Sequence, residues 1–364
     1  MMINKINEAM KMTKQSFKPD EQTKKERDAM LNPVTNLLQD YKASLGDGTQ
    51  EFRGLASGFD EIDKLIGGLD RFVLLAGRSG AGKTTLALQL ALGVANKRVP
   101  VLIYSFEMSK FEIITSLVKT TAHNLGLTGL FTNTIELQGN SPTLPDEIKS
   151  AIEQSLTELG RTGERLYIKD STNGIPKILP TADPKDKAPT IYDDVEQVKK
   201  KTGSDKVLVL IDSVQDVVPT DNPNQVQAEI KAVSDLTILQ QKTGATILVT
   251  AQKNKGSVNS VDSYGDVMGS MTFIHKPNTV LELITPDEMI KKASADEKER
   301  LNEAIKGIEQ DSKNGEGKPM FLNVIKGRFT GRSDLAVTYY GAYGYFEGKR
   351  ATDRESQKLY SLFD

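Results

Sequence analysis

The residues best suited to chemistry form one glycine-rich run that ends in a lysine and two threonines. The run is Gly77-Arg78-Ser79-Gly80-Ala81-Gly82-Lys83-Thr84-Thr85, and it fits the pattern G-x-x-x-x-G-K-[ST]. Glycines let the backbone curl so that its N–H groups face phosphate oxygens, while the lysine reaches the β- and γ-phosphates. The run therefore predicts a nucleoside triphosphate site, ATP being the expected substrate, with Thr84 as a ligand of Mg²⁺.

Hydrolysis at such a site needs a second magnesium ligand, usually a carboxylate at the end of a neighbouring buried strand. Asp212 follows the apolar run 207–211 and is the candidate. An aspartate in this position can also cap the end of a strand. Together with the glycine-rich run, the metal-binding interpretation is favoured.

Two further side chains are candidates for handling the attacking water. Glu107 lies just past the apolar run 101–105, where ligands bind in open α/β sheets, and is the expected catalytic base. The alternative is a charge at the start of the helix that begins near Met108. Gln252 follows a third apolar run, 246–250, and its amide could contact the γ-phosphate or the water and report hydrolysis to the following loop.

The elements that must position these residues alternate along the chain. Buried strands and helices of this kind indicate an α/β fold with a mostly parallel sheet covered on both faces. The expected strands are 72–76, 101–105, 207–211 and 246–250, and the expected helices are 86–94, 111–122 and 228–241.

Composition narrows the class of protein. The 364 residues include no cysteine and only two histidines, which excludes disulfides, thiolate zinc sites and a histidine-rich metal site. The first 28 residues are polar, so neither a signal peptide nor a membrane span is expected there, and a cytoplasmic protein is the simplest interpretation. A net charge of -2 argues against a surface coated for nucleic acid, but not against a local basic channel.

We expect a main domain, 54–347, with three segments outside it and two insertions within it. Residues 1–31 form a mobile polar arm, and residues 32–46 form a short linker helix with the apolar stripe Val34, Leu37, Leu38 and Tyr41. Residues 171–190 and 286–318 are expected as surface insertions, the second containing a charged helix. Residues 348–364 form a C-terminal tail.

Taken together, the motifs resemble those of the DnaB-like replicative helicases, in the same order along the chain. The resemblance rests on Gly58-Phe59 with Asp63, the glycine-rich run, Tyr104-Ser105-Phe106-Glu107-Met108-Ser109, Ile211-Asp212-Ser213-Val214-Gln215 and Gln252. It implies a RecA-like P-loop NTPase core preceded by a linker helix. It further implies an ATP-dependent helicase that forms a hexameric ring, moves on single-stranded DNA during replication, and works with a primase or loader in a bacterial cell. The gene could lie on a bacterial, phage or plasmid genome.

The same resemblance assigns the segment Ile325-Lys326-Gly327-Arg328-Phe329-Thr330-Gly331 near the end of the domain. It is similar to the family's Lys-x-Arg segment, in which both cations reach the ATP of the neighbouring subunit. The resemblance implies that Lys326 and Arg328 act in trans, Arg328 as the arginine finger. It also implies that the linker helix docks on the next subunit in the ring.

DNA contacts are expected in the segment 253–271, which follows Gln252 and is rich in Gly, Ser and Asn. Lys253, Lys255 and the turn Gly269-Ser270 are the candidate contacts in a loop lining a central pore, and an ordinary surface loop is the alternative.

Two other functions remain open. Ser213-Val214-Gln215 after Asp212 is closer to RadA-like recombination ATPases, so one alternative is a RadA-like or KaiC-like ATPase acting in recombination or remodelling. The other is a nucleotide-dependent assembly or loading factor with little turnover.

Overall fold

The computed structural model describes residues 52–127, 144–181, 183, 185–218, 224–253, 272–292, 295–311, 317–328, 334–341 and 343–348, together with Val34 and Leu38. The chain divides into two units, Met1–Glu51 and Phe52–Asp364. In the first unit, Val34 and Leu38 are helical and exposed, within the predicted linker helix. The predicted arm 1–31 and, apart from Gly348, the predicted tail 348–364 lie outside the described residues.

One sheet organises the described part of the second unit, and nine strands contribute to it in the order β3-β2-β4-β5-β1-β6-β7-β8-β9. The strands from β3 to β6 in this order pair in parallel, and β7, β8 and β9 continue the sheet antiparallel. The predicted mostly parallel α/β sheet is confirmed. The strands are β1 Phe72–Gly77, β2 Val101–Ser105, β3 Leu166–Lys169, β4 Leu208–Asp212, β5 Thr246–Gln252, β6 Thr279–Ile284, β7 Lys318–Gly327, β8 Asp334–Tyr340 and β9 Tyr345–Gly348.

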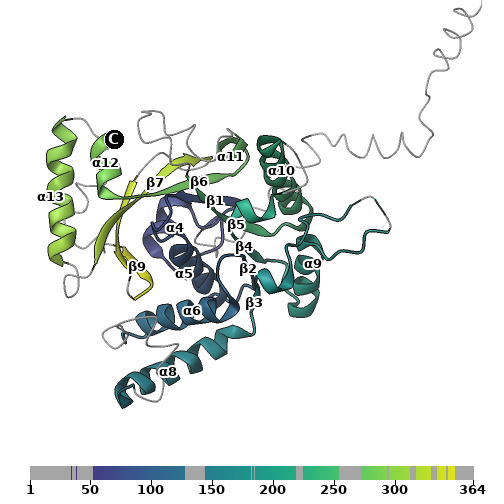
Figure 1. Cartoon of the computed structure of the whole chain (residues 1–364), viewed down its shortest axis with the longest axis horizontal. Helices are drawn as coiled ribbons and strands as arrows, with labels where there is room; N and C mark the ends of the chain where they lie inside the picture. Colours follow the sequence, from purple (N-terminus) through teal and green to yellow (C-terminus); the bar gives the residue numbers. More distant parts are fainter. Residues whose placement is uncertain are drawn as a thin grey trace, which may run out of the picture. The chain divides into compact units, whose positions relative to one another are not determined.

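Strand β1 shows why helices must cover both faces of the sheet. All six of its residues are buried, and successive side chains of a strand point to opposite faces. Val73 and Leu75 pack in the apolar cluster that contains the residues of α5, whereas Leu74 and Ala76 pack in the cluster of α9 and α10. Figure 1 accordingly shows α5 and α6 on one side of the sheet and α9 and α10 on the other.

The helices begin and end where local sequence signals place them. Ser109 and Glu112 form a capping box at the start of α6, and Thr190 with Asp193 does the same for α9. Helices α4, α8, α9 and α11 were not predicted from the sequence. The helices are α4 Asp60–Ile66, α5 Lys83–Asn96, α6 Lys110–Asn124, α8 Asp146–Gly163, α9 Ile191–Thr202, α10 Gln225–Thr243, α11 Thr272–His275, α12 Pro286–Lys292 and α13 Ala295–Asp311. None of the helices described here is long and apolar enough to cross a membrane.

Both predicted insertions contribute residues to the packed core. In 171–190, Ile178 is buried against the α9 and α10 side, and Lys177 forms a β-bridge with Thr190. In 286–318, the chain forms two helices, α12 and α13, where one was expected. Met289 of α12 and Leu301 of α13 are buried against the sheet residues Ile284 and Phe321, so this region is more than a surface loop.

Candidate active site

The glycine-rich run forms the turn between β1 and α5 at the carboxyl edge of the sheet. Gly80 and Gly82 have φ angles of 77° and 90°, a backbone region that strongly favours glycine. A Cβ on Gly82 would also lie 2.8 Å from the ring of Phe346. Gly82 is the N-cap of α5 and the first turn of this helix holds no acidic residue, so its amide groups are suited to bind an anion.

Lys83 begins α5 and lies within the turn. Its side chain is buried, and its Nζ donates a hydrogen bond to the carbonyl oxygen of Arg78 at 2.9 Å. Burial lowers the pKa of Lys83, while the nearby carboxylates of Asp212 and Glu107 act in the opposite direction. A bound phosphate would supply further negative charge to this ammonium group.

Asp212 ends β4 and faces the turn, as the sequence predicted for a metal ligand. Thr84 Oγ1 donates to Asp212 Oδ2 at 2.8 Å, and Thr250 Oγ1 donates to Asp212 Oδ1. Thr250 lies on the neighbouring strand β5 and was missed, because a threonine inside an apolar strand is ordinary in β-structure. The two oxygens of Asp212 are therefore oriented by hydroxyl groups from two different elements.

These donors fit a divalent cation with hard oxygen ligands. A hydroxyl and a carboxylate oxygen converge here, and no group of three His, Asp or Glu side chains in the described ranges could hold a metal by itself. Mg²⁺ commonly binds to one or two protein oxygens and keeps waters and substrate phosphates as its other ligands. Thr84 and Asp212 could hold it in this way.

Glu107 and Gln252, predicted separately, lie together in the structure. Gln252 Nε2 donates to Glu107 Oε1 at 3.4 Å, and both residues are exposed at the carboxyl edge. The alternative role of Glu107, a charge that starts the next helix, is taken by other residues, because Ser109 and Glu112 cap α6. Glu107 is thus available for a water molecule near the phosphates.

Strand pairing explains how residues so distant in sequence meet. Ser105 lies opposite Asp212 in the β2–β4 pair, and Gly77 lies opposite Gln252 in the β1–β5 pair. The strands β2, β4, β5 and β1 are adjacent in the sheet. Their carboxyl ends therefore bring Glu107, Asp212, Gln252 and the glycine-rich run 77–85, which we call the phosphate loop, to one edge of the sheet. Ligand sites in open α/β sheets lie at this edge.

The region 286–318 also contacts the phosphate loop. Glu288 of α12 accepts from Arg78 Nε at 2.5 Å, and its other oxygen accepts from the backbone N–H and the hydroxyl of Thr285 at 3.1 Å. The second pair of contacts is a capping arrangement that defines the start of α12. The structure thus gives Arg78 an ion-pair partner that the sequence pattern did not indicate.

Lys253, a predicted DNA contact, has a different partner. Its ammonium group forms an ion pair with Glu282 of β6, and the two side chains are 7% and 1% exposed. Its backbone N–H donates to the carbonyl oxygen of Gly77 at 3.2 Å. To contact DNA, Lys253 would have to give up this buried ion pair, which disfavours the predicted DNA contact. Lys255, Gly269 and Ser270 lie outside the described residues.

Lys326 and Arg328 lie at the opposite edge of the sheet, because β7 runs antiparallel to β6. The N–H of Arg328 donates to the carbonyl of Asn278 at 3.1 Å, and the N–H of Asn278 donates to the carbonyl of Phe72 at 2.8 Å. Phe72 begins β1 and Gly77 ends it. At about 3.3 Å per residue, the backbone of Arg328 is therefore displaced from its own phosphate loop by about 16 Å along the sheet.

The two cations of this segment differ in their surroundings. Arg328 is exposed, whereas the Lys326 Nζ donates to the carbonyl oxygens of Ile274, His275 and Pro277 at 2.8, 2.6 and 2.7 Å. Burial and the neighbouring Arg328 lower the pKa of Lys326. Within the single chain, the ammonium group of Lys326 thus contacts backbone carbonyls of its own fold, and the trans role implied by the resemblance stays a prediction.

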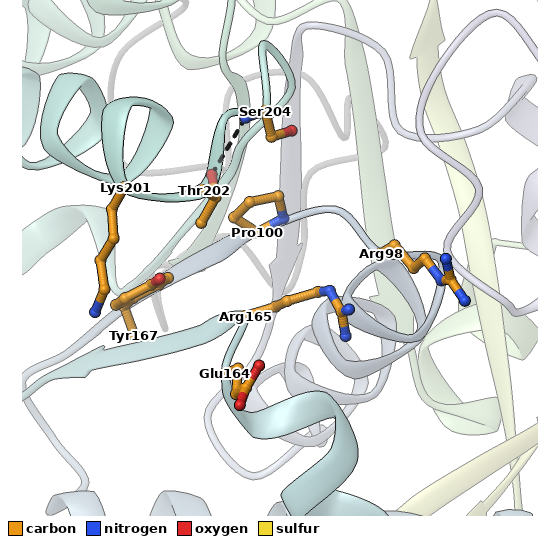
Figure 2. Close-up of a pocket in the computed structure, with 8 residues that line it drawn as sticks. All are labelled: Arg98, Pro100, Glu164, Arg165, Tyr167, Lys201, Thr202 and Ser204. Carbon is orange, nitrogen blue, oxygen red and sulfur yellow. Dashed lines mark hydrogen bonds between the residues drawn. The ribbon is translucent and has the colours of Figure 1, made fainter.

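A basic cavity of about 500 Å³ lies where β2, β3 and β4 begin (Figure 2). Its lining includes Arg98, Arg165 and Lys201, and Lys201 lies over the ring of Tyr167 with Nζ 5.1 Å from the ring centroid. These cations come at or just after the ends of α5, α8 and α9. Helix C-termini carry partial negative charge, so the three cations offset it, and the location does not favour a phosphate.

The fold and the arrangement of side chains define a P-loop ATPase. Residues 41–258, more than half of the chain, match the family of AAA domains, and the chain belongs to this family. The protein is therefore a nucleotide-binding ATPase. No curated protein sequence matches the chain.

Similar solved structures show which type of P-loop fold the chain has. One of them, an ATPase domain, aligns with 88% of this chain and 99% of its own length, with a TM-score of 0.69 and 19% identity. A DnaB-like replicative helicase, described with its interactions with primase, aligns with 90% of this chain and 71% of its own, with a TM-score of 0.67 and 20% identity. The fold is thus the RecA-like fold of DnaB-like helicase ATPase domains, as predicted.

A third solved structure aligns with this chain less closely than the first two. A KaiC-like protein from Pyrococcus horikoshii covers 82% of this chain and 100% of its own, with 15% identity and a TM-score of 0.45, which is too low to establish a shared fold.

Proposed function

We propose that the protein is an ATP-driven, ring-forming DNA helicase that moves along single-stranded DNA and separates duplex DNA during replication. One observation carries the proposal: the phosphate loop and Arg328 lie at opposite edges of the same sheet. A site that needs this arginine can then be completed only by a second subunit. The fold shared with a DnaB-like replicative helicase and the family membership support the proposal.

Nucleotide binding uses the loop between β1 and α5. When ATP binds, Lys83 gives up its hydrogen bond with the Arg78 carbonyl and contacts the β- and γ-phosphates instead. The backbone amides at the start of α5 bind phosphate oxygens. Thr84 and Asp212 hold a divalent cation, which when bound offsets phosphate charge. Thr250 keeps the Asp212 carboxylate in the orientation that this role requires.

Hydrolysis uses Glu107 as the general base. Its carboxylate accepts a proton from the water that attacks the γ-phosphate, and the amide of Gln252 orients that carboxylate. When the phosphate leaves, the contact of Gln252 can change. Because Gln252 ends β5 immediately before the segment 253–271, a change in its contact would be passed to the proposed DNA loop.

Arg328 completes the site of a neighbouring subunit. A guanidinium group that reaches the γ-phosphate stabilises the charge that develops during transfer. We propose a hexameric ring in which each Arg328 serves the next phosphate loop and the helix 32–46 docks on a neighbour. Lys255, Gly269 and Ser270 are the proposed DNA contacts, and the solved helicase described with primase makes a primase or a loader the proposed partner.

The test measures ATP turnover of the full chain with and without single-stranded DNA while light scattering follows oligomer size, with Lys83→Ala as the inactive control. We expect turnover to rise with DNA in assembled rings, together with strand displacement on a forked duplex. Stimulation without displacement would favour a recombination or remodelling ATPase. Slow hydrolysis that DNA does not change would favour an assembly or loading factor.

A further inference from the structure

The ammonium group of Lys326 contacts three backbone carbonyls at the end of α11. Its Nζ lies 2.8 Å from the oxygen of Ile274, 2.6 Å from that of His275 and 2.7 Å from that of Pro277. A lysine ammonium has three donor hydrogens, so these three acceptors can use its full donor capacity. While these contacts last, Lys326 has no N–H left for a neighbour's phosphate.

The same turn also binds the arginine two residues further on. Asn278, at the end of the turn, accepts from the N–H of Arg328 at 3.1 Å and donates to the carbonyl of Phe72 at 2.8 Å. Lys326 and Arg328 therefore hold the turn 274–278 at two points, one through a side chain and one through the backbone. The conformation of this turn and the position of Arg328 are mechanically linked.

The turn needs such support, because α11 is only four residues long. The last carbonyls of any helix lack partners within the helix, and a cation is a favourable partner for them. A helix this short does not persist alone in water. Phe273 and Ile274 are buried, which anchors α11 to the core, and Lys326 secures its end.

We propose that Lys326 is a positioning residue that holds the turn 274–278 against β7 in its own subunit and so fixes how Arg328 is presented to the neighbouring site. The proposal rests on the proposed trans role of Arg328. It differs from a direct contact of Lys326 with the neighbour's ATP in one respect that can be measured. A positioning residue acts only through Arg328, whereas a direct contact acts in addition to it.

A double-mutant cycle separates the two roles. ATP turnover at saturating ATP is measured for assembled rings of Lys326→Met, Arg328→Ala and the double variant. We expect Lys326→Met to lower kcat by a factor of about 10 to 10² through misplacement of Arg328, with KM for ATP unchanged. The double variant should be no slower than Arg328→Ala alone. A double variant slower by the full factor of Lys326→Met would overturn the proposal.

Hydrogen exchange gives a second readout that needs no ring. In Lys326→Met, the amides of Asn278 and Arg328 should exchange faster than in the wild type, whereas Lys318→Met, an exposed lysine on the same strand, should leave them unchanged. Lys326→Arg should restore part of the protection, because a guanidinium also donates to carbonyls. Unchanged exchange in Lys326→Met would refute the proposal. If Arg328→Ala alone leaves turnover intact, the trans role fails instead, and exchange still shows whether Lys326 holds the turn.

Discussion

The two edges of the sheet carry cations in opposite electrostatic settings. At the carboxyl edge, α5 and α6 begin, and Lys83 lies among helix N-termini, Asp212 and Glu107. At the other edge, α5, α8 and α9 end beside Arg98, Arg165 and Lys201. Helix N-termini favour anions and helix C-termini favour cations. The first edge is therefore suited to bind phosphates, whereas Arg98, Arg165 and Lys201 at the second edge offset the partial negative charge of the helix ends beside them.

Arg328, at the second edge, is the cation that we propose acts on a neighbouring subunit. Like Arg98 and Lys201 it is exposed, whereas its neighbour Lys326 is engaged with backbone carbonyls. Helix C-termini and backbone carbonyls thus compete with phosphate for basic side chains. A basic side chain is a good candidate for binding phosphate only where such partners do not already engage it.

Arg328→Ala should fold and bind ATP but lose a factor of about 10³ in turnover, within the range of arginine fingers. Steady-state ATPase and nucleotide titration measure the two properties. Mixing this variant with Lys83→Ala should restore part of the activity, because an intact phosphate loop can then meet an intact Arg328. If mixed rings are shown to form and remain inactive at every ratio, Arg328 does not act in trans.

Lys253→Met should lower the free energy of unfolding by about 3 kcal/mol, because it removes the cation that pairs with the buried carboxylate of Glu282. Urea denaturation measures the change. The double variant Lys253→Met with Glu282→Gln should recover part of the loss, since the buried charge is removed as well. A stable single variant whose DNA binding has a flatter salt dependence would return Lys253 to the DNA contacts.

Glu107→Gln should keep nucleotide affinity and reduce hydrolysis by a factor of about 10², because the base is lost while the metal ligands remain. Glu112→Gln is the matched control at the same edge: it belongs to the capping box of α6, and turnover should not change. Equal losses of binding and turnover in Glu107→Gln would assign the residue a structural role.

The double variant Arg165→Ala with Lys201→Ala tests the basic cavity and should have the smallest effect. We expect unchanged KM for ATP and an unchanged salt dependence of DNA binding, with a loss of at most about 1 kcal/mol in stability from the helix ends. A log–log salt slope for single-stranded DNA that falls by about 0.7 per lysine or arginine removed would show that the cavity binds phosphates.

Several features could be predicted from sequence because they depend on local requirements. The run 77–84 is recognisable partly because the backbone needs glycine at Gly82, a fixed position of the pattern, where φ is positive. Strand 101–105 was predicted with the bounds it has, since a strand buried on both faces is apolar throughout. Segments with weaker patterns, such as α8 and β3, were missed because amphipathic surface elements give no such continuous signal.

The sequence identified the phosphate loop, and it singled out Asp212, Glu107 and Gln252 because each lies at or just past the end of an apolar run. The partners of the polar side chains followed from the fold: Gln252 contacts Glu107, Thr250 contacts Asp212, Lys253 pairs with Glu282, and Lys326 contacts three carbonyls. It also decided that Arg328 lies far from its own phosphate loop. The physical reason is that a polar side chain on a strand can pair with many partners, and the strand order and the antiparallel direction of β7 determine which of them it meets.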